Sequence, residues 1–600
     1  MSMVMEADAV EMRDAMESAV APMRQAGLDA LARGDGAQAA AEFEQLVEDG
    51  SQEVSDYLNL GNAYLLLRRN QDAARCFLEV LARAPASAEA RHNLGLACLG
   101  MGAWADAALC FGEAIAFRRP YPQASEALGF ALERLDRLDE AAGSYRDALR
   151  EEPDRAALWR RLAAVLVDTG KYDEAGQALL ESERREPGSA DAALVAGLLA
   201  QRQRDFTRAE QGFRAAVAQR PEWVEAWCNL SSALALQGRG VESGEAALKA
   251  LRRNPRHVGS HCNFALARKL VGDYTTALEC YRRAMAIQPE DARVHWNLAV
   301  TLLAMGQWEE RWREFDWRFE AAITRRRQYD APVWDGSDIG GRTILVWAEQ
   351  GLGDTIQFLR FLPPLRAKGA RIILEVPGRL LPLLDHAPVL RETGTELVGQ
   401  GEDLPPFDAH IPMMSLPRWM GGAPVGTGLL ACHRRPSTPP PCSVPKVGLC
   451  WSGNPEHYHD HFRSIDPALL APLRQIDNLH WFALQREGKC PWEGIHRPED
   501  HTTDLMDAAA IVSELDLVIT VDTMVTHLAA TLGRPVWLLL PAMADWRWGI
   551  EGTSTHWYPS VRLFRQQAMG DWGPVIAELA SELTSWRDTF QTTPSWRSAP

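Results

Sequence analysis

Across the first half of the chain, small and apolar residues recur with a period of 34 residues. A small residue marks each period, at Gly27, Gly61, Gly95, Gly129, Ala163, Gly197, Ser231, Ala265 and Ala299. An aromatic ring follows 16 positions later in most periods, at Phe43, Phe77, Phe111, Tyr145 and Phe213 among others, and a proline closes most periods. This pattern predicts pairs of antiparallel helices, in which small residues allow close approach, aromatic rings fill the space opposite and proline ends the second helix.

From Arg342 onward the pattern changes to short apolar runs that alternate with helical stretches. The runs expected to form strands are TILVWA, RIILEV, KVGLCW, HWFALQ, LVITV and PVWLLL. Such alternation is typical of parallel sheets that helices cover on both faces. The proline-rich stretch HRRPSTPPPCSVPK divides this region into two Rossmann-like halves, which we place at 342–440 and 441–590.

The last repeat differs from the others because it carries Trp308, Trp312 and Trp317 at helical spacings. A solenoid normally ends in a polar face, so we expect this aromatic face to pack on the domain that follows. The sequence thus predicts an N-terminal tail (1–19), a solenoid of eight to nine units (20–325), a linker (326–341), the two α/β halves and a C-terminal tail (591–600).

Charge and composition narrow the classes of partner. The chain has 63 basic and 80 acidic residues and a net charge of −17, which disfavours nucleic acid and anionic membrane surfaces as general partners. No apolar run approaches the ~18 residues that span a bilayer, and the acidic N-terminus does not resemble a secretory signal. Ten cysteines without a C-x-x-C pair suit free thiols in a reducing compartment. We therefore expect a cytoplasmic protein.

The periodic half resembles the tetratricopeptide repeat. An asparagine lies two residues before the small position in five units, at Asn59, Asn93, Asn229, Asn263 and Asn297. A groove-facing asparagine can donate to and accept from the backbone of an extended peptide, so these residues are candidates for polypeptide binding. The alternative is that asparagine is simply common at this position of the repeat. Ala127, Arg161 and Val195 interrupt the series and divide it into two stretches.

Four loops that follow predicted strands carry the candidate chemistry, because open α/β sheets bind ligands beyond the carboxyl ends of their strands. The first loop contains Gln350, Gly351, Gly353, Asp354 and Gln357. The second holds Gly453, Asn454, Arg463 and Ser464, and the third is Gln485. The fourth holds Asp522, Thr523, Thr526 and His527 at the start of a helix, whose free amides favour a phosphate. For Asp354 alone, a helix N-cap is the simpler role.

Together these loops resemble the glycosyltransferases built from two Rossmann domains, the GT-B type, and in particular the heptosyltransferase group of family 9. The resemblance is strongest at Gly353-Asp354 and at Asp522-Thr523 with His527. It implies that Asp354 is the general base and that the Gln350 to Gln357 loop faces the acceptor. It also implies that the second half binds a nucleotide-diphosphate sugar, with Arg463, Ser464 and Thr523 at the diphosphate and Asp522 at the sugar hydroxyls or in the loop.

Repeats joined to such a domain are similar in layout to the protein O-N-acetylglucosaminyltransferases. We therefore expect an inverting, metal-independent glycosyltransferase that uses no cofactor and modifies a hydroxyl on a polypeptide held by the repeats. Three alternating histidines, His457, His459 and His461, have no nearby cysteine to complete a metal site. The alternative is a non-catalytic repeat adaptor with a degenerate transferase domain. Met524 motivates it, because the family usually has glycine after the Asp-Thr pair.

Overall fold

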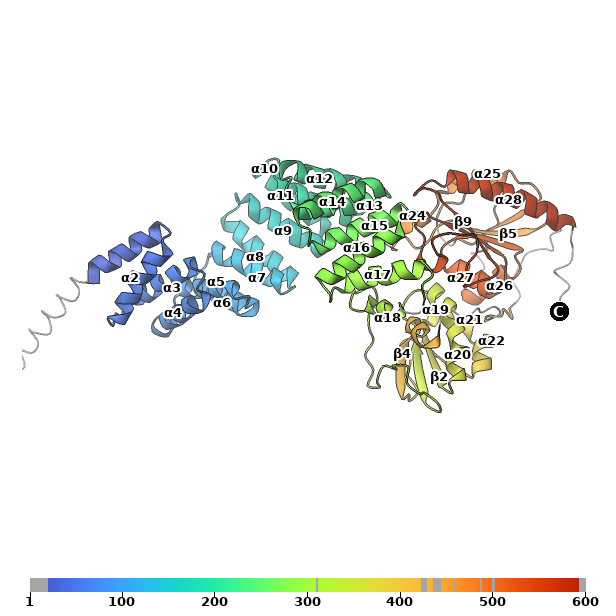
Figure 1. The fold of residues 1–600 in the computed structure, drawn as a ribbon, viewed down its shortest axis with the longest axis horizontal. Coiled ribbons are helices and arrows are strands. Elements are labelled where there is room, and N and C mark those ends of the chain that lie inside the picture. The colour runs from blue at the N-terminus through green and yellow to red at the C-terminus, as the bar shows by residue number, and fades with distance from the viewer. Residues whose placement is uncertain are drawn as a thin grey trace, which may run out of the picture. The chain divides into compact units, whose positions relative to one another are not determined.

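The computed structural model describes residues 20–308, 311–421, 429–434, 444–457, 459–485, 488–498 and 502–592, which Figure 1 shows as a coloured ribbon. The predicted tail 1–19 lies outside the described residues, as do all but the first two residues of the predicted C-terminal tail. The chain divides into two compact units, 1–233 and 234–600.

The first unit is built from helices that alternate along the chain. After a helical stretch over 20–32, its elements are α2 (Gly36–Glu48), α3 (Val54–Leu66), α4 (Asn70–Arg83), α5 (Ala88–Gly100), α6 (Trp104–Phe117), α7 (Pro122–Arg134), α8 (Leu138–Glu151), α9 (Ala156–Asp168), α10 (Tyr172–Arg185), α11 (Ala190–Arg202) and α12 (Phe206–Gln219). The unit boundary falls inside α13 (Val224–Leu236). The helix pairs predicted from the 34-residue period are therefore confirmed.

Close packing within each pair explains the small residue. A Cβ atom placed on this glycine would lie 2.5–2.7 Å from the aromatic ring of the following helix, in the pairs Gly27–Phe43, Gly61–Phe77, Gly95–Phe111, Gly129–Tyr145 and Gly197–Phe213. The turn inside each pair also repeats, because a residue with positive φ recurs every 34 positions, at Gly34, Arg68, Gly102, Asp136, Gly170 and Arg204. Each repeat thus combines a tight helix contact with a left-handed turn.

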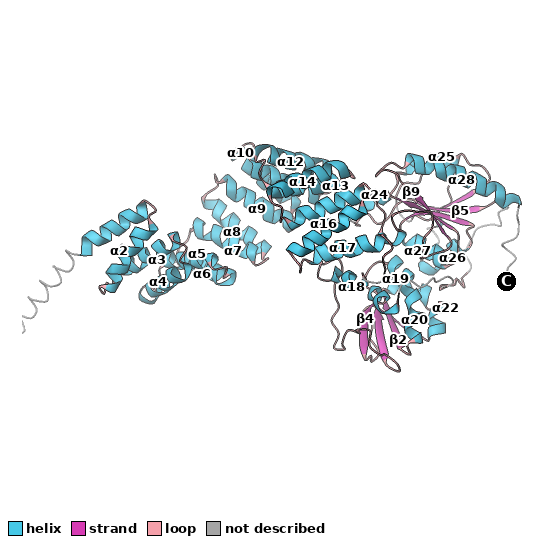
Figure 2. Cartoon of the chain, viewed as in Figure 1, coloured by secondary structure: helices cyan, strands magenta, loops and turns pink. Residues whose placement is uncertain are grey.

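The second unit begins with more repeat helices and continues into two sheets. The helices are α14 (Gly240–Arg253), α15 (Val258–Leu270), α16 (Tyr274–Ile287) and α17 (Ala292–Ala304), followed by α18 (Trp312–Phe315) and the 3-10 helix η1 (Asp316–Arg318). Among the described residues, strands occur only in this unit, as the magenta arrows of Figure 2 show.

Both sheets are parallel throughout. The first has the order β3-β2-β1-β4, with β1 (Thr343–Trp347), β2 (Arg371–Val376), β3 (Glu396–Gly399) and β4 (Ala409–Pro412). The second has the order β6-β5-β7-β8-β9, with β5 (Lys446–Cys450), β6 (His480–Ala483), β7 (Leu517–Val521), β8 (Val536–Leu540) and β9 (Val561–Arg565). All six predicted strands are present, whereas β3, β4 and β9 were not predicted.

Short helices connect the strands and cover the sheets. In the first sheet region they are α19 (Leu352–Phe358), η2 (Leu359–Phe361), α20 (Leu362–Ala367), η3 (Gly378–Leu380), α21 (Leu381–Leu384), α22 (Pro388–Thr393), η4 (Met413–Ser415) and α23 (Pro417–Met420). In the second they are α24 (Asp460–Arg463), η5 (Pro467–Leu470), α25 (Ala471–Arg474), α26 (Leu505–Ser513), α27 (Met524–Thr531), η7 (Trp546–Trp548) and α28 (Gly573–Thr592).

The aromatic end of the repeats packs on the sheets, as predicted. Trp308 and Trp312 meet the ring of Trp546, with centroids 6.3 Å and 5.6 Å away, and Trp308 lies 5.3 Å from Trp557. Tyr274, Leu303 and Phe315 belong to the same hydrophobic core as residues of both sheets. The last repeats and the two sheets therefore share one core.

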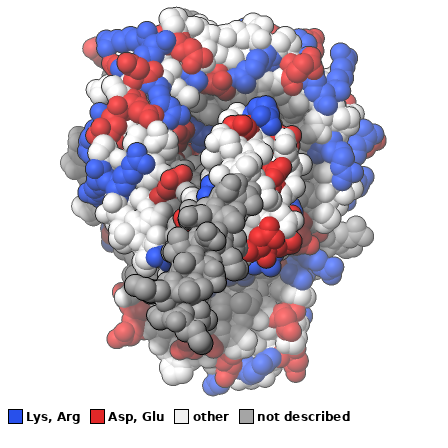
Figure 3. All heavy atoms as spheres, turned by 90° about the vertical axis from the view of Figure 1, so that its left-hand side faces the viewer, with Lys and Arg blue, Asp and Glu red and all other residues white. Residues whose placement is uncertain are grey.

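On the face shown in Figure 3, acidic and basic side chains are interspersed. Within the described residues, no helix is both long enough and apolar enough to cross a membrane.

Candidate functional site

The first predicted loop lies where β1 ends and α19 begins. Gly351 is the N-cap of α19, and its backbone N–H donates to Asp354 Oδ2 over 2.9 Å. The Asp354 carboxylate therefore closes the first turn of its own helix, as an N-terminal aspartate does. Gln350, beside it, has a buried Nε2 with no hydrogen-bond partner among the described residues.

Gly353 is required by a contact with the second sheet region. A Cβ at this position would lie 2.8 Å from His527 Cδ2 and 3.2 Å from the Cα of Met524. The start of α19 thus packs directly against α27, so the two predicted loops carrying Asp354 and Asp522 meet. The glycine serves this helix contact, whereas the sequence reading gave it a role in the acceptor loop.

Arg547, on η7 of the second sheet region, joins that region to the first loop and was not predicted. It forms an ion pair with Asp354 Oδ1, and its Nε donates to Gln357 Oε1 over 2.7 Å. Its Nη1 donates to Asp545 Oδ1 over 2.8 Å. Burial alone would lower the pKa of Arg547, but the Asp545 and Asp354 carboxylates outweigh burial and raise it. The guanidinium is therefore permanently charged at the junction of the two sheets.

A signal for Asp545 and Arg547 was present in the sequence. Both follow the predicted strand PVWLLL, which is β8, and the rule that directs attention to loops after strands applies to it equally. Asp545 is exposed, whereas Arg547 is only 9% exposed.

The second predicted loop forms a hydrogen-bonded ring around Asp460. Ser464 Oγ donates to Asp460 Oδ2 over 2.8 Å and accepts from the Gly453 N–H over 3.0 Å. Arg463 Nε donates to Asp460 Oδ1 over 2.9 Å, and its Nη1 donates to the Asp522 carbonyl over 2.9 Å. A Cβ at Gly453 would lie 2.5 Å from Arg463 Nη2. The loop after β5 therefore connects to the loop after β7.

Asp522 lies at the end of β7, between two arginines and a second acid. Burial, together with the Asp545 carboxylate, raises the pKa of Asp522 to about 6, although Trp548, Arg463 and Arg547 act in the opposite direction. Thr523, next in sequence, is the N-cap of α27 and makes no side-chain cap. The first amides of α27 are therefore without a side-chain acceptor from the cap residue. We name Asp354, Asp522, Asp545, Arg463 and Arg547 the charged cluster.

Two other residues predicted to bind the sugar donor, Thr526 and His527, are buried and form hydrogen bonds within the protein. Thr526 is fully buried and donates to the Val521 carbonyl over 3.2 Å. His527 is 5% exposed, with Nδ1 2.9 Å from the Tyr558 hydroxyl. Burial and the charges of Arg547 and Arg360 hold the pKa of His527 well below its usual value, so its ring is neutral.

Gln485 and Asn454 lie at the edges of the site. Gln485 Oε1 accepts from the Ser452 N–H over 3.1 Å, which ties the end of β6 to the loop after β5. Asn454 is exposed and its Oδ1 accepts from the Glu456 N–H over 3.0 Å. The structure thus brings Gly453, Arg463, Ser464, Asp522 and Thr523 together, with Gln485 beside them and Asn454 on the rim.

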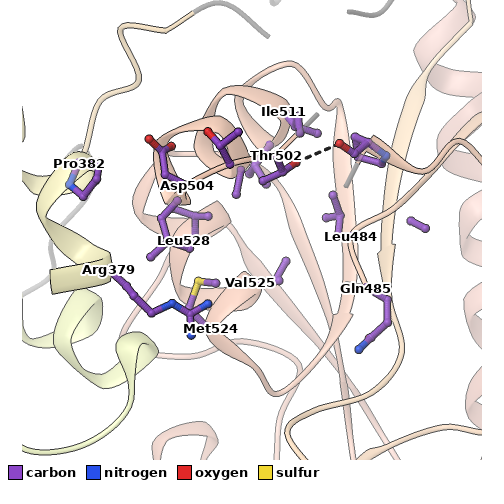
Figure 4. Close-up of a pocket in the computed structure, with 16 residues that line it drawn as sticks. Arg379, Pro382, Leu484, Gln485, Thr502, Asp504, Ile511, Met524, Val525 and Leu528 are labelled. Carbon is purple, nitrogen blue, oxygen red and sulfur yellow. Dashed lines mark hydrogen bonds between the residues drawn. The ribbon is translucent and has the colours of Figure 1, made fainter. Parts of the chain in front are cut away.

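A pocket of about 300 Å³ lies beside the start of α27. Its walls are mostly apolar, with Leu484, Ile511, Val525 and Leu528 among them, and its polar groups include Gln485, Thr502 and Asp504. Figure 4 shows Arg379, from η3 of the first sheet region, extending next to Met524. Residues from both sheet regions therefore line one cavity, and Met524 forms part of its wall.

The three alternating histidines lie close together but have different hydrogen-bond partners. His457 Nδ1 accepts from the backbone N–H of His459 over 3.3 Å, and His461 Nε2 donates to the Leu236 carbonyl over 3.0 Å. Burial and the neighbouring histidines lower the pKa of His459 to about 4. In the described part of the chain, no three His, Cys, Asp or Glu side chains come together in a metal-binding arrangement.

The predicted peptide-binding asparagines occupy one position of the first helix in their repeats. Asn59 is on α3, Asn93 on α5, Asn229 on α13, Asn263 on α15 and Asn297 on α17, and all five are partly exposed. Asn93 Nδ2 donates to Asn62 Oδ1 over 2.8 Å, so neighbouring repeats are linked here by side-chain amides.

Comparison with known proteins agrees with this division of the chain. Residues 24–74, 58–125 and 194–257 match one tetratricopeptide repeat family, 134–202 match a second, and 267–306 match a TPR repeat family. Residues 501–540 match glycosyltransferase family 9 (heptosyltransferase). This segment contains α26, β7, α27 and β8, and thus Asp522, Thr523 and part of the pocket wall.

Individual relatives extend the comparison. Protein FlbA of Caulobacter vibrioides is 29% identical over 327 residues, covering 47% of this chain and 53% of FlbA. The chain therefore spans about half the length of this curated relative. The APC/C hetero-tetramer Cut9-Hcn1 covers 46% of this chain and 54% of its own at 16% identity, with a TM-score of 0.36. A tetratricopeptide repeat protein from Parabacteroides merdae covers 42% and 100% at 13% identity, with a TM-score of 0.38. The chain thus has the layout of tetratricopeptide repeats followed by a glycosyltransferase family 9 segment.

Proposed function

We propose that this chain is an inverting, metal-independent glycosyltransferase of GT-B architecture. It moves a sugar from a nucleoside-diphosphate donor to a hydroxyl on a polypeptide. The observation that carries the proposal is the coincidence of the family 9 segment with the pocket and with Asp522 and Thr523 at the start of α27.

The pocket suits the nucleoside of the donor. Its size and its apolar wall fit a base and ribose, and Gln485 and Thr502 provide groups that can orient them. The diphosphate then lies at the start of α27, where the amides and the positive end of the helix dipole favour an anion. Arg463, hydrogen-bonded to the Asp522 carbonyl, adds positive charge at that place. These fixed positive charges stabilise the diphosphate in place of the divalent ion that other transferases use.

Asp354 is the proposed general base. Gly351 and Arg547 hold its two oxygens, and each carboxylate oxygen keeps a further lone pair for an acceptor hydroxyl. Asp354 takes the hydroxyl proton as the acceptor oxygen attacks the anomeric carbon. The bond from that carbon to the diphosphate oxygen breaks, and the leaving group carries the electron pair. The configuration at the anomeric carbon is inverted because one displacement occurs.

The repeats provide a place for a polypeptide acceptor. Tetratricopeptide repeats typically bind peptides, and the five partly exposed asparagines can bond to a peptide backbone. Each such bond contributes only about 0.5–1.5 kcal/mol, so several must act together.

The test is a donor screen in the presence of EDTA. Nucleoside diphosphates and their sugars are offered to the full chain, binding is measured by calorimetry, and transfer to proteins of a cell extract is measured by mass spectrometry. We expect one nucleotide to bind without metal, Asp354→Ala to bind it but not to transfer sugar, and Thr523→Glu to lose binding. Asp354→Ala with unchanged turnover, or activity only after metal is added, would refute the mechanism.

Met524 favours a second candidate, a repeat adaptor whose transferase region has lost catalysis. Its side chain forms part of the pocket wall at the start of α27, where a glycine would leave the backbone open. An adaptor binds a peptide tightly and binds no nucleoside diphosphate. Nucleotide binding that Thr523→Glu abolishes excludes this candidate.

A further inference from the structure

The last repeats contact the loops that form the charged cluster. His461, on α24, donates from Nε2 to the carbonyl of Leu236 at the end of α13. Gly238, in the turn that follows, lies so close to the second sheet region that a Cβ there would be 2.9 Å from Met569 Cβ. The repeats thus lie against α24, which carries Arg463, and Trp308 packs on Trp546 of η7, whose N-cap is Asp545.

Lys269 lies near the end of α15, in one of these last repeats. It is partly exposed, and its ammonium lies 6.0 Å from the centre of the Tyr274 ring. Burial lowers the pKa of Lys269 to about 8, while the Asp545 carboxylate opposes that shift. The charge of Lys269 in turn contributes to the lowered pKa of His459. The ammonium therefore interacts electrostatically with Asp545 of the charged cluster and with His459.

The arginines of the charged cluster already donate to protein acceptors. Arg547 donates to Asp354, Gln357 and Asp545. Arg463 donates to Asp460 and to the Asp522 carbonyl. The Lys269 ammonium, in contrast, has no hydrogen bond or ion pair with any residue that the structure describes. A partly desolvated cation without a bonded partner is stabilised when an anion binds next to it.

We propose that Lys269 binds the phosphate of the donor nucleotide, so that a repeat helix supplies part of the transferase site. This inference rests on the proposed function. An ammonium offers three donors and a full charge, and both interactions strengthen as negative charge develops on the leaving diphosphate. The catalytic region is then incomplete without the repeat that carries α15. This gives the fusion of the two parts a chemical reason in addition to acceptor binding.

Inorganic pyrophosphate, a nucleoside diphosphate and the corresponding nucleoside are the probes, titrated by calorimetry into the full chain with EDTA. Lys269→Met is expected to weaken binding of pyrophosphate and of the diphosphate by about tenfold or more, because a charged hydrogen bond contributes about 1.5–3 kcal/mol. Binding of the nucleoside should not change. Lys368→Met, which removes an exposed lysine of the first sheet region, is the matched control.

The pH dependence separates contact with phosphate from a structural role. Asp545, His459 and Tyr274 face Lys269; the pKa of His459 is about 4 and that of Tyr274 is raised, so both are neutral from pH 7 to 9. Lys269 is charged below its pKa of about 8 and loses its proton as the pH rises through it. Wild-type affinity should therefore fall over this range relative to Lys269→Arg, which stays charged.

The outcomes distinguish the two proposals. Wild-type binding of the diphosphate with equal binding by Lys269→Met overturns the role of Lys269 and leaves the proposed function standing. Absence of binding by the wild type overturns both. Equal loss of nucleoside and diphosphate binding in Lys269→Met shows a structural effect and also overturns the phosphate contact.

Discussion

At the scale of single residues, Asp522 shows how surroundings set the charge of a carboxylate. It ends a buried strand beside a second acid, and burial and Asp545 raise its pKa to about 6. Near neutral pH the side chain is mostly ionised and would repel the phosphate that we propose to bind at α27. Below pH 6 it is mostly protonated, and the repulsion disappears.

Nucleotide binding is therefore expected to strengthen as the pH falls from 7.5 to 5.5. The phosphate favours the protonated form of Asp522, and the pKa of about 6 places the change in this interval. Asp522→Asn resembles the protonated form, so it should bind at least as tightly at pH 7.5 and lose most of this dependence. Calorimetric titration of both proteins at several pH values measures the difference. Parallel pH profiles for the two proteins would contradict the assignment.

Site residues that directly follow a predicted strand could be predicted from the sequence, because ligands bind beyond the carboxyl ends of strands. Site residues whose position depends on tertiary packing could not. Asp354, Arg463 and Asp522 follow strands with strong apolar patterns, so their convergence could be expected from the sequence. Lys269 lies in a repeat helix, and its place near Asp545 depends on how that helix packs on the sheets. Gly353 was singled out for close backbone approach, but the residues it meets, Met524 and His527 of α27, lie 171 and 174 positions further along the chain.

At the scale of elements, the packing of α19 against α27 fixes the position of the first sheet region relative to the second. Arg547 adds a bridge of polar groups to Asp354 and Gln357 at the same junction. The apolar and polar contacts coincide here, so a disturbance of either helix start changes the distance between Asp354 and Asp522.

Gly353→Ala is expected to destabilise the second unit by about 1–3 kcal/mol, since the added methyl overlaps His527 and the α27 backbone. Chemical denaturation followed by tryptophan fluorescence measures the shift. Gly378→Ala is the control, because a Cβ there meets nothing within 4 Å and its φ is not positive. If the two variants unfold at the same denaturant concentration, α19 and α27 do not pack as closely as described.

The three strands that were not predicted from the sequence were missed for one physical reason. β3, β4 and β9 are all edge strands of their sheets. An edge strand has one side without a partner strand and tolerates polar residues, as Glu396 and Arg562 illustrate. The central strands β1, β5, β7 and β8 are buried on both faces, which gives them the continuous apolar runs that are read most easily.

At the scale of the whole molecule, Arg318 connects the end of the repeats to the first sheet. Its side chain is fully buried and forms an ion pair of 2.7 Å with the equally buried Glu349, just after β1. It also donates to Ser415 over 2.8 Å. The buried guanidinium of Arg318 on η1 therefore links three elements, since its partners Glu349 and Ser415 lie after β1 and on η4.

Arg318→Met is expected to destabilise the second unit by about 3–5 kcal/mol, because Glu349 is left buried without its partner. The double variant Arg318→Met with Glu349→Gln should recover part of the loss. Arg326→Met, which removes an exposed ion pair with Glu320, should change stability by less than about 1 kcal/mol. Thermal unfolding of the four proteins gives the comparison. Equal melting temperatures for the two single variants would show that the buried pair contributes little.

The single core shared by the last repeats and the sheets also determines where this protein can be re-engineered. A cut at the predicted linker would expose Trp308, Trp312 and Phe315 and remove α15, whereas the division between the two compact units falls in α13. A chimera should therefore be joined ahead of that helix, with everything from residue 234 onward inherited together. The repeats upstream of α13 can then be exchanged for others, and such a swap leaves the shared core intact.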